Sequence, residues 1–334
     1  MKIPFHGGLP GAVAALATLV LVLVGFACRT GAQDPRVGSS GEHGRAQEES
    51  VAGSALDPQV IEDASGARVT VAEDGVVRIS WSRDDVPVTI DGMPFPPAAG
   101  LGSWAAFKGM EGGAMVMGDT VVFRDEVDAA IDAAFAHGLA VTALHNHFLY
   151  DEPIVYFMHV GGHGEPTKLA KGVKAMWDAI KQVREKHAKP AGRFPGPIPR
   201  PGDGQLDPGA IERITGLDAS VQPGGVVKVS AGREARMNGV SFGGSLGLTT
   251  WAAFSGTNEL AAMDGDFAMT EQEVQPVLRA LRNAGIHVVA LHNHMIGERP
   301  SYYFVHFWGI GPARQLAEGL KATLDAQRNV AGSR

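Results

Sequence analysis

One segment of this chain occurs twice, and this duplication limits the fold more than any other feature of the sequence. Residues 104–107 (WAAF) return at 251–254, and residues 143–147 (ALHNH) return at 290–294, both at a spacing of 147 residues. The matches begin with LDP at 56–58, which returns at 206–208. Similarity of this density predicts two tandem copies of one structural unit.

Each copy has a mixed pattern of secondary structure. Segments that are rich in β-branched residues or continuously apolar predict strands; in the first copy these are 76–81, 86–90, 103–107, 114–122, 139–145 and 154–160. Two helices are expected per copy, one around 127–138 and one that carries Leu169 and Ile180 on its apolar face. The sequence therefore predicts an α+β fold with a mainly antiparallel sheet, whose two copies pack about a pseudo-twofold axis.

The duplication also sets the domain boundaries. Repeat 1 is expected over 55–186 and repeat 2 over 206–330. Residues 187–205 between them are rich in Pro and Gly, which predicts a linker because proline is excluded from helix interiors and central strands. Residues 29–54 are polar and rich in Gly and Ser, which is typical of a flexible tether.

Residues 1–28 have the pattern of an export signal. Lys2 precedes an apolar segment at 11–27 that is shorter than the ~20 residues needed to span a bilayer. Cys28, the only cysteine of the chain, follows at once, where a lipoprotein signal carries its acylated residue. The sequence thus predicts an exported protein of the cell envelope or periplasm, anchored to the membrane by a lipid on Cys28. Ordinary cleavage, with Cys28 incidental, is the alternative.

The charge of the chain bears on its partners. The net charge is −7 and no long cluster of Lys and Arg is present. A nucleic-acid partner is therefore not expected, since such binding depends on neutralising phosphates. The expected partners are the membrane and an unidentified small molecule or envelope component.

Each repeat has two histidines separated by one residue at the end of a predicted strand. They are His145 and His147 in repeat 1, and His292 and His294 in repeat 2. Side chains at i and i+2 of a strand share a face, with Cα atoms about 6–7 Å apart, so two imidazoles can reach one ion. The acids that follow closely are Asp151, Glu152 and Glu298. Two imidazoles and a carboxylate form a ligand set that zinc, manganese or iron accepts.

Further polar residues recur at matched positions: His159, His306, Asn146, Asn293, Asp119 and Asp266. If the hairpin after His147 is tight, His159 lies opposite Val141, about 13 Å along the strand from His145. At that distance His159 is a poor ligand for the same ion. These residues are therefore assigned to the surroundings of the ion rather than to its ligands.

A structural interpretation remains open beside the metal site. Histidine and asparagine at strand ends also bond each other and nearby backbone groups, and a duplication copies such a network as readily as a functional one. Trp104, Trp251, Met115 and Met117 are predicted to be core residues. Because Asp264 takes the place of Met117 in repeat 2, the sequence argues against a copper site with thioether ligands.

The repeated blocks resemble a known family. The pattern ALHNH-x4-EP-x2-YF-x-H at 143–159, its counterpart at 290–309 and the two WAAF segments look like the LppY/LpqO family of bacterial lipoproteins. The resemblance covers residues 56 to about 330. It implies export and lipidation, and it supplies no reaction and no catalytic residues.

Three functions are compatible with these patterns. A divalent ion in each repeat could activate water for the hydrolysis of an envelope substrate, which makes a metal-assisted hydrolase the first enzyme class to consider. The duplicated unit could instead bind a small envelope ligand without catalysis, or serve as a structural lipoprotein. The sequence favours metal binding and assigns no substrate.

Overall fold

The structure is a computed structural model that describes residues 55–200 and 206–331. The expected export signal, Cys28 and the tether at 29–54 lie outside the described residues, as does the end of the expected linker at 201–205. None of the described helices is both long and apolar enough to cross a membrane.

Repeat 1 contains three helices and nine strands. Its helices are α1 (Pro58–Ser65), α2 (Val127–Ala136) and α3 (Pro166–Lys186), with a short 3-10 helix η1 (Pro97–Ala99). Its strands are β1 (Val69–Val71), β2 (Val77–Ser82), β3 (Thr89–Ile90), β4 (Met93–Pro94), β5 (Gly102–Met110), β6 (Gly113–Phe123), β7 (Ala140–His145), β8 (Asp151–Glu152) and β9 (Val155–Gly164).

Repeat 2 follows the same order of elements. Its helices are α4 (Pro208–Thr215), α5 (Glu271–Asn283) and α6 (Ala313–Ala331), with 3-10 helices η2 (Pro223–Gly225) and η3 (Gly244–Leu246). Its strands are β10 (Ala219–Gln222), β11 (Val226–Gly232), β12 (Ala235–Met237), β13 (Val240–Phe242), β14 (Thr249–Gly256), β15 (Ala261–Thr270), β16 (His287–His292) and β17 (Tyr302–Gly311).

Twelve of these strands form one antiparallel sheet in the order β1-β2-β5-β6-β9-β7-β16-β17-β15-β14-β11-β10. The order in repeat 2 is thus the order of repeat 1 reversed. The repeats meet where β7 pairs antiparallel with β16, at Leu144 and Leu291. These two residues occupy equivalent places in the duplication, so a local twofold axis relates the paired strands. The α+β class and the mainly antiparallel sheet are confirmed.

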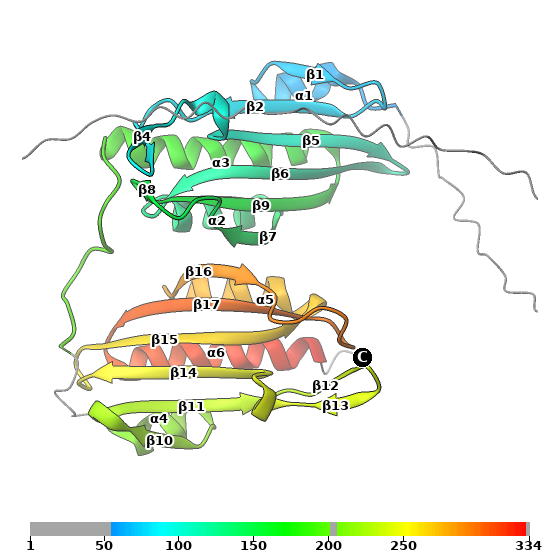
Figure 1. The fold of residues 1–334 in the computed structure, drawn as a ribbon. Helices are drawn as coiled ribbons and strands as arrows, with labels where there is room; N and C mark the ends of the chain where they lie inside the picture. The colour runs from blue at the N-terminus through cyan, green and yellow to red at the C-terminus, as the bar shows by residue number, and fades with distance from the viewer. Residues whose placement is uncertain (1–54, 201–205, 332–334) are drawn as a thin grey trace, which may run out of the picture. The chain divides into compact units, whose positions relative to one another are not determined.

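In each repeat the helices cover one face of the sheet (Figure 1). The Trp177 indole N–H on α3 donates to the Thr120 hydroxyl of β6 at 3.1 Å, which places Thr120 on the helix-covered face. Successive strand residues alternate between faces, so Asp119 lies on the opposite one. Val116 and Val160 belong to the core beneath the helices. We call the face opposite the helices the open face.

One end of the open face is covered by a small additional sheet in repeat 1. Strands β4, β3 and β8 form this sheet, and a second core beneath it includes Val88, Leu101, Phe123 and Phe157. In repeat 2 the corresponding cover is the β12–β13 hairpin, over a core that includes Phe304. Phe157 and Phe304 therefore place rigid, buried rings directly beside His147 and His294.

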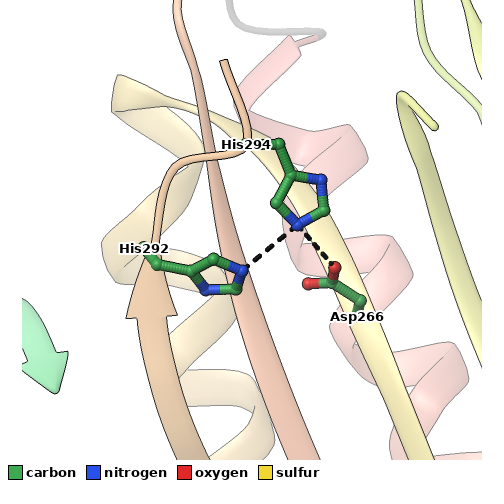
Figure 2. Close-up of side chains that lie close together, drawn as sticks. All are labelled: Asp266, His292 and His294. Carbon is green, nitrogen blue, oxygen red and sulfur yellow. Dashed lines mark hydrogen bonds and ion pairs between the residues drawn. The ribbon is translucent and has the colours of Figure 1, made fainter. Parts of the chain in front are cut away.

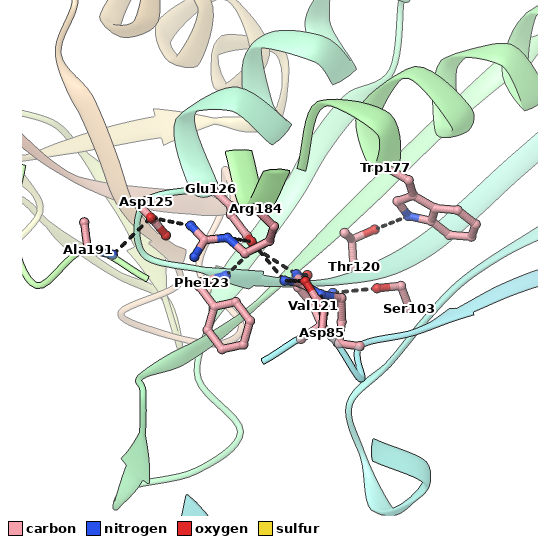
Figure 3. Close-up of polar contacts among 11 residues, drawn as sticks. Asp85, Ser103, Thr120, Val121, Phe123, Asp125, Glu126, Trp177, Arg184 and Ala191 are labelled. Atoms are coloured by element: carbon pink, nitrogen blue, oxygen red, sulfur yellow. Dashed lines mark hydrogen bonds and ion pairs between the residues drawn. The ribbon is translucent and has the colours of Figure 1, made fainter. Parts of the chain in front are cut away.

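A buried network of charges joins α2 and α3 of repeat 1 to the sheet (Figure 3). Glu126 accepts from the Arg83 guanidinium at 2.8 and 2.9 Å and lies 2.7 Å from Arg184 Nε. Arg83 also contacts Asp85, and Arg184 contacts Asp125. Arg83 and Glu126 have fully buried side chains, and such charges are tolerated only when they are paired.

Each repeat has a third helix that the sequence analysis did not predict. Asp57 caps the N-terminus of α1 by accepting from Gln59 N–H, and Gly66 ends the helix in the left-handed conformation. Asp207 and Gly216 do the same for α4. The signals of a short capped helix were present in the sequence, but only eight residues separate them, too few to show an apolar period.

Candidate metal centre

Four side chains converge on the open face of repeat 2. Asp266 lies on β15, directly opposite His306 on β17. His292 ends β16, which pairs with the other edge of β17. His294 follows two residues later, and its ring stacks on Phe304 with centroids 3.5 Å apart. We call Asp266, His292, His294 and His306 the repeat 2 cluster.

His294 is the centre of the repeat 2 cluster (Figure 2). Its Nε2 lies 3.1 Å from His292 Nε2 and 3.2 Å from Asp266 Oδ2. The His306 ring lies almost parallel to the His292 ring, with centroids 4.8 Å apart. One hydrogen on His294 Nε2 can serve only one of the two short contacts well. An ion bonded to all three atoms would satisfy them together.

The distances fit a tetrahedral ion. Zinc binds histidine nitrogen and carboxylate oxygen at about 2.0–2.2 Å, which in a tetrahedron separates neighbouring ligand atoms by roughly 3.3 Å. The separations of 3.1 and 3.2 Å about His294 Nε2 are close to this value. His306 Nδ1 lies 3.3 Å from the Gly265 carbonyl oxygen. A histidine that donates from Nδ1 to a carbonyl keeps Nε2 as an acceptor, the usual state of a metal ligand.

Two buried polar atoms of the repeat 2 cluster have no hydrogen-bond partner among the described residues. They are Asp266 Oδ1 and His292 Nδ1. Burial raises the pKa of Asp266, and the three histidines act against this rise. Burial likewise lowers the pKa of His292, which favours the neutral imidazole. A buried carboxylate without a partner is costly, and a bound cation would remove that cost.

Repeat 1 repeats the arrangement with a looser geometry. Asp119 on β6 lies opposite His159 on β9, with 3.9 Å between Asp119 Oδ1 and His159 Nε2. The His145 ring is 5.1 Å from both the His147 and the His159 ring. His147 stacks on Phe157 at 3.3 Å, and burial lowers its pKa. We call Asp119, His145, His147 and His159 the repeat 1 cluster.

The sequence analysis misplaced His159 because it assumed a tight hairpin. Nine residues separate the end of β7 from the start of β9, and His159 lies opposite Ala143 rather than Val141. The register shifts between Val141 and Ala143, as at a β-bulge. The His159 ring is therefore 5.1 Å from the His145 ring, and the His306 ring is 4.8 Å from the His292 ring. The expected register is wrong, but the ligand atoms that lie within 4.8 Å of one another among the described residues are those of Asp266, His292 and His294, without His306.

The structure does not bring the predicted acids into the clusters. Asp151 is buried and accepts from Val155 N–H at 2.6 Å, and Glu298 is buried and accepts from Tyr302 N–H at 2.8 Å. Both carboxylates thus hold the loop between the histidines and the next strand. Glu152 is exposed on β8, opposite Thr89. The acids that do lie beside the histidines are Asp119 and Asp266, because each faces its histidine across a strand pair.

The exposure of four other residues that the sequence analysis named can be compared with the expectations for them. Asn146 and Asn293 are exposed, and Asn293 donates to the Met295 carbonyl oxygen at 3.0 Å. Met115 and Met117 were predicted to be core residues, which is wrong: 42% and 59% of their surfaces are exposed. They lie on the open face of β6 because they alternate with the buried residues Ala114 and Val116.

A groove of about 1060 Å³ lies away from both clusters. Its lining includes Tyr156, Phe194, His287, Trp308 and Ile310, and none of the eight cluster residues. His147 and His294 are exposed, so each cluster reaches the protein surface. An ion held there would keep positions for water on its solvent side, which metal-assisted hydrolysis requires.

Comparison with solved structures finds bacterial microcompartment shell proteins. The trimeric shell protein PduB is 11% identical over 79% of this chain and 92% of its own, with a TM-score of 0.20. EtuB from Clostridium kluyveri is 10% identical over 79% and 92%, with a TM-score of 0.18. The double-ringed trimeric shell protein MSM0271 is 14% identical over 80% and 97%, with a TM-score of 0.17. At such TM-scores the likeness carries no argument for a role of this chain.

These comparisons correct several sequence-based expectations. The matching family model is described as a domain of unknown function and not as the LppY/LpqO family. The expected LppY/LpqO membership is therefore wrong, and the lipid anchor on Cys28 and the envelope or periplasmic location, which that resemblance supported, are withdrawn with it. So are the envelope ligand-binding and structural lipoprotein roles that depended on them.

A comparison with curated protein sequences finds no match. A family model does match, and it matches each repeat separately, over residues 59–179 and 209–326. Each matched segment contains one complete cluster of an aspartate and three histidines. The chain therefore belongs to the family described as Domain of Unknown Function (DUF1259), of which it carries two tandem copies.

Proposed function

We propose that this protein binds divalent transition-metal ions on the open face of its sheet, first of all at the repeat 2 cluster. One observation carries the proposal: His294 Nε2 lies within 3.2 Å of both a second imidazole nitrogen and a buried carboxylate oxygen. The partnerless atoms Asp266 Oδ1 and His292 Nδ1 add support, because buried polar atoms are normally paired.

The donor set defines the class of ion. The two imidazoles of His292 and His294 and the carboxylate of Asp266 have ligand atoms within 4.8 Å of one another. Such a set suits zinc and also manganese or iron, whereas the repeat 2 cluster offers no sulfur ligand. Burial lowers the pKa of His292, which favours the neutral form that can donate a lone pair to a metal. The stacking of His294 on Phe304 fixes one ligand ring before any ion arrives, and such preorganisation favours binding.

The test is a zinc titration of the full-length protein by calorimetry, with elemental analysis after dialysis. The variant His292→Ala/His294→Ala should lose one bound ion per chain. His137→Ala/His187→Ala, which changes two exposed histidines outside both clusters, is the matched control and should bind zinc as the wild type does.

Asp266→Asn gives a finer arm of the same test. It removes the carboxylate charge while keeping the size of the side chain, so zinc affinity should fall by about tenfold or more. Equal zinc content in the wild type and in the His292→Ala/His294→Ala variant would refute the proposal.

A further inference from the structure

The open face of repeat 1 carries an exposed thioether beside its cluster. Met117 is two residues before Asp119 on β6, so both side chains lie on the same face. Although methionine is usually buried, 59% of the Met117 surface is exposed. Met117 pairs with Ala106 on one side and Gly161 on the other. Its neighbours on both adjacent strands are thus small residues.

Met117 is within reach of the repeat 1 cluster. His159 is opposite Asp119, so Met117 and His159 are diagonal neighbours on adjacent strands. Diagonal neighbours lie about 7–8 Å apart at Cα, a distance that long side chains bridge. Asp119 Oδ1, also in this cluster, is buried and has no hydrogen-bond partner among the described residues.

Repeat 2 places a different group at the same position. Asp264 stands where repeat 1 has Met117, and it pairs with Ala253 and Trp308. Because Asp266 pairs with His306 and Asp264 with Trp308, Asp264 and His306 are diagonal neighbours on adjacent strands. Its counterpart Met117 occupies the same place relative to His159. Because Asp264 stands only in repeat 2, it rules out a thioether ligand there and not in repeat 1, which corrects the expectation from the sequence.

We infer that the two repeats bind different metal ions: repeat 1 is a copper(I) site formed by His145, His147, His159 and the thioether of Met117, and repeat 2 takes a harder divalent ion. The inference rests on the proposed function, because it assigns a metal preference to each of two proposed sites. Thioether sulfur selects copper(I), imidazole accepts both kinds of ion, and carboxylates favour harder ones.

The wider spacing of the repeat 1 cluster agrees with this assignment. The 3.9 Å between Asp119 Oδ1 and His159 Nε2 is longer than neighbouring ligands on one tetrahedral zinc ion require. In repeat 2 Asp266 lies 3.2 Å from His294, whereas Asp119 forms no ion pair with His147, the counterpart of His294, in the described part of the chain. The carboxylate of repeat 1 is thus less well placed to be a ligand. Met117, on the open face of β6, supplies the fourth donor in place of the Asp119 carboxylate.

The test loads the full-length protein with copper(I) under ascorbate in the absence of oxygen, in competition with a chromogenic copper(I) chelator. Met117→Leu keeps the size and apolar character of the side chain and removes the sulfur. It should weaken copper(I) binding by about tenfold or more and leave the zinc affinity of repeat 2 unchanged. X-ray absorption of the wild-type copper complex should show a copper–sulfur distance that Met117→Leu lacks.

Met115→Leu is the matched control. Met115 lies on the same face of the same strand but four residues from Asp119, about 13 Å away along β6, so this variant should bind copper(I) as the wild type does. Unchanged copper(I) affinity in Met117→Leu, or no copper–sulfur distance in the wild type, overturns the inference while zinc binding at repeat 2 stands. A wild type that binds neither ion overturns the proposed function as well.

Discussion

The two repeats have the same order of paired strands in the sheet but differ in the ion pairs of their equivalent arginines. In repeat 1, Arg83 is fully buried between Glu126 and Asp85. In repeat 2 its counterpart Arg233 is 23% exposed and pairs with Glu273. Ala235 stands in place of Asp85. The two repeats have thus kept the same strand pairing. Their side chains have diverged, both in the ion pairs around Arg83 and Arg233 and in the clusters on the open face.

The largest difference between the repeats is expected in the loss of stability when the carboxylate that pairs with the buried arginine, Glu126 or Glu273, is neutralised. Glu126→Gln leaves Arg83 and Arg184 without their shared counter-charge in a buried place. Removing one partner of a buried ion pair costs about 3–5 kcal/mol. Glu273→Gln should cost only about 1–2 kcal/mol, because Arg233 reaches solvent. Urea denaturation followed by circular dichroism measures both, and equal losses would contradict the comparison.

The next largest difference is expected in the stability cost of adding a side chain to the glycines that precede the cluster aspartates, Gly118 and Gly265. A Cβ on Gly265 would lie 2.3 Å from both the Trp251 carbonyl oxygen and the Phe307 ring, whereas a Cβ on Gly118 would meet the Trp104 carbonyl oxygen at 2.9 Å. Overpacking costs about 1–3 kcal/mol, so Gly265→Ala should fall at the upper end and Gly118→Ala at the lower.

Thermal unfolding of the two glycine variants checks this order. The Ala substitutions differ only in the repeat that carries them, so each serves as the control of the other. A larger loss of stability in Gly118→Ala than in Gly265→Ala would show that the packing behind the two clusters is not as the structure has it.

The tighter geometry of repeat 2 should appear as tighter zinc binding. His294 lies 3.2 Å from Asp266 and 3.1 Å from His292, whereas its counterpart His147 forms no ion pair with Asp119 among the described residues. A preorganised site avoids the cost of ordering its ligands on binding, and we expect about a tenfold difference in zinc affinity between the repeats. In a calorimetric titration, His294→Ala should remove the tighter phase and His147→Ala the weaker one. The reverse assignment would show that the relative order of the two sites is wrong.

The sequence predicted most of the sheet because strand periodicity and the repeat are local signals. The segments 103–107 and 114–122 became β5 and β6 with one to three further residues at each end. Thr270 and Glu273 form a capping box at the start of α5, at the spacing of three residues that such a box requires. The segment 86–90 formed a strand only at Thr89–Ile90, since Val86 and Val88 instead fill the second core.

The candidate site was predicted only in part, because some of its residues meet through the register of strands that are distant in the sequence. His145, His147 and their counterparts were found because i and i+2 on one strand is a local relation. Asp119 and His159 are 40 positions apart in the chain, and they meet through the pairing of β6 with β9. That pairing depends on loop length and on a β-bulge, which a strand pattern does not encode. Proximity in sequence therefore favoured Asp151 and Glu298, which serve the loops instead.

The smallest expected effect concerns Asp85, which repeat 2 lacks. Burial acts to raise the pKa of Asp85, but hydrogen bonds and charge from Arg83 outweigh it, so the pKa is lowered. Its stabilising contribution is therefore present above the unfolded-state pKa of about 3.9 and is lost as the pH falls through the lower folded-state value. The side chain is 33% exposed, so the contribution should be below about 1 kcal/mol.

The measurement is the free energy of unfolding of wild type and Asp85→Asn as a function of pH. The two should differ at neutral pH and converge in acid, below about pH 4. Glu126, whose pKa burial raises, is present in both proteins and so affects the difference less than the absolute values. Asp84→Asn, at the exposed neighbouring position, is the control and should follow the wild type. A constant gap between wild type and Asp85→Asn down to pH 2 would mean that the loss comes from packing, and that Arg83 depends on Glu126 alone, as Arg233 does on Glu273.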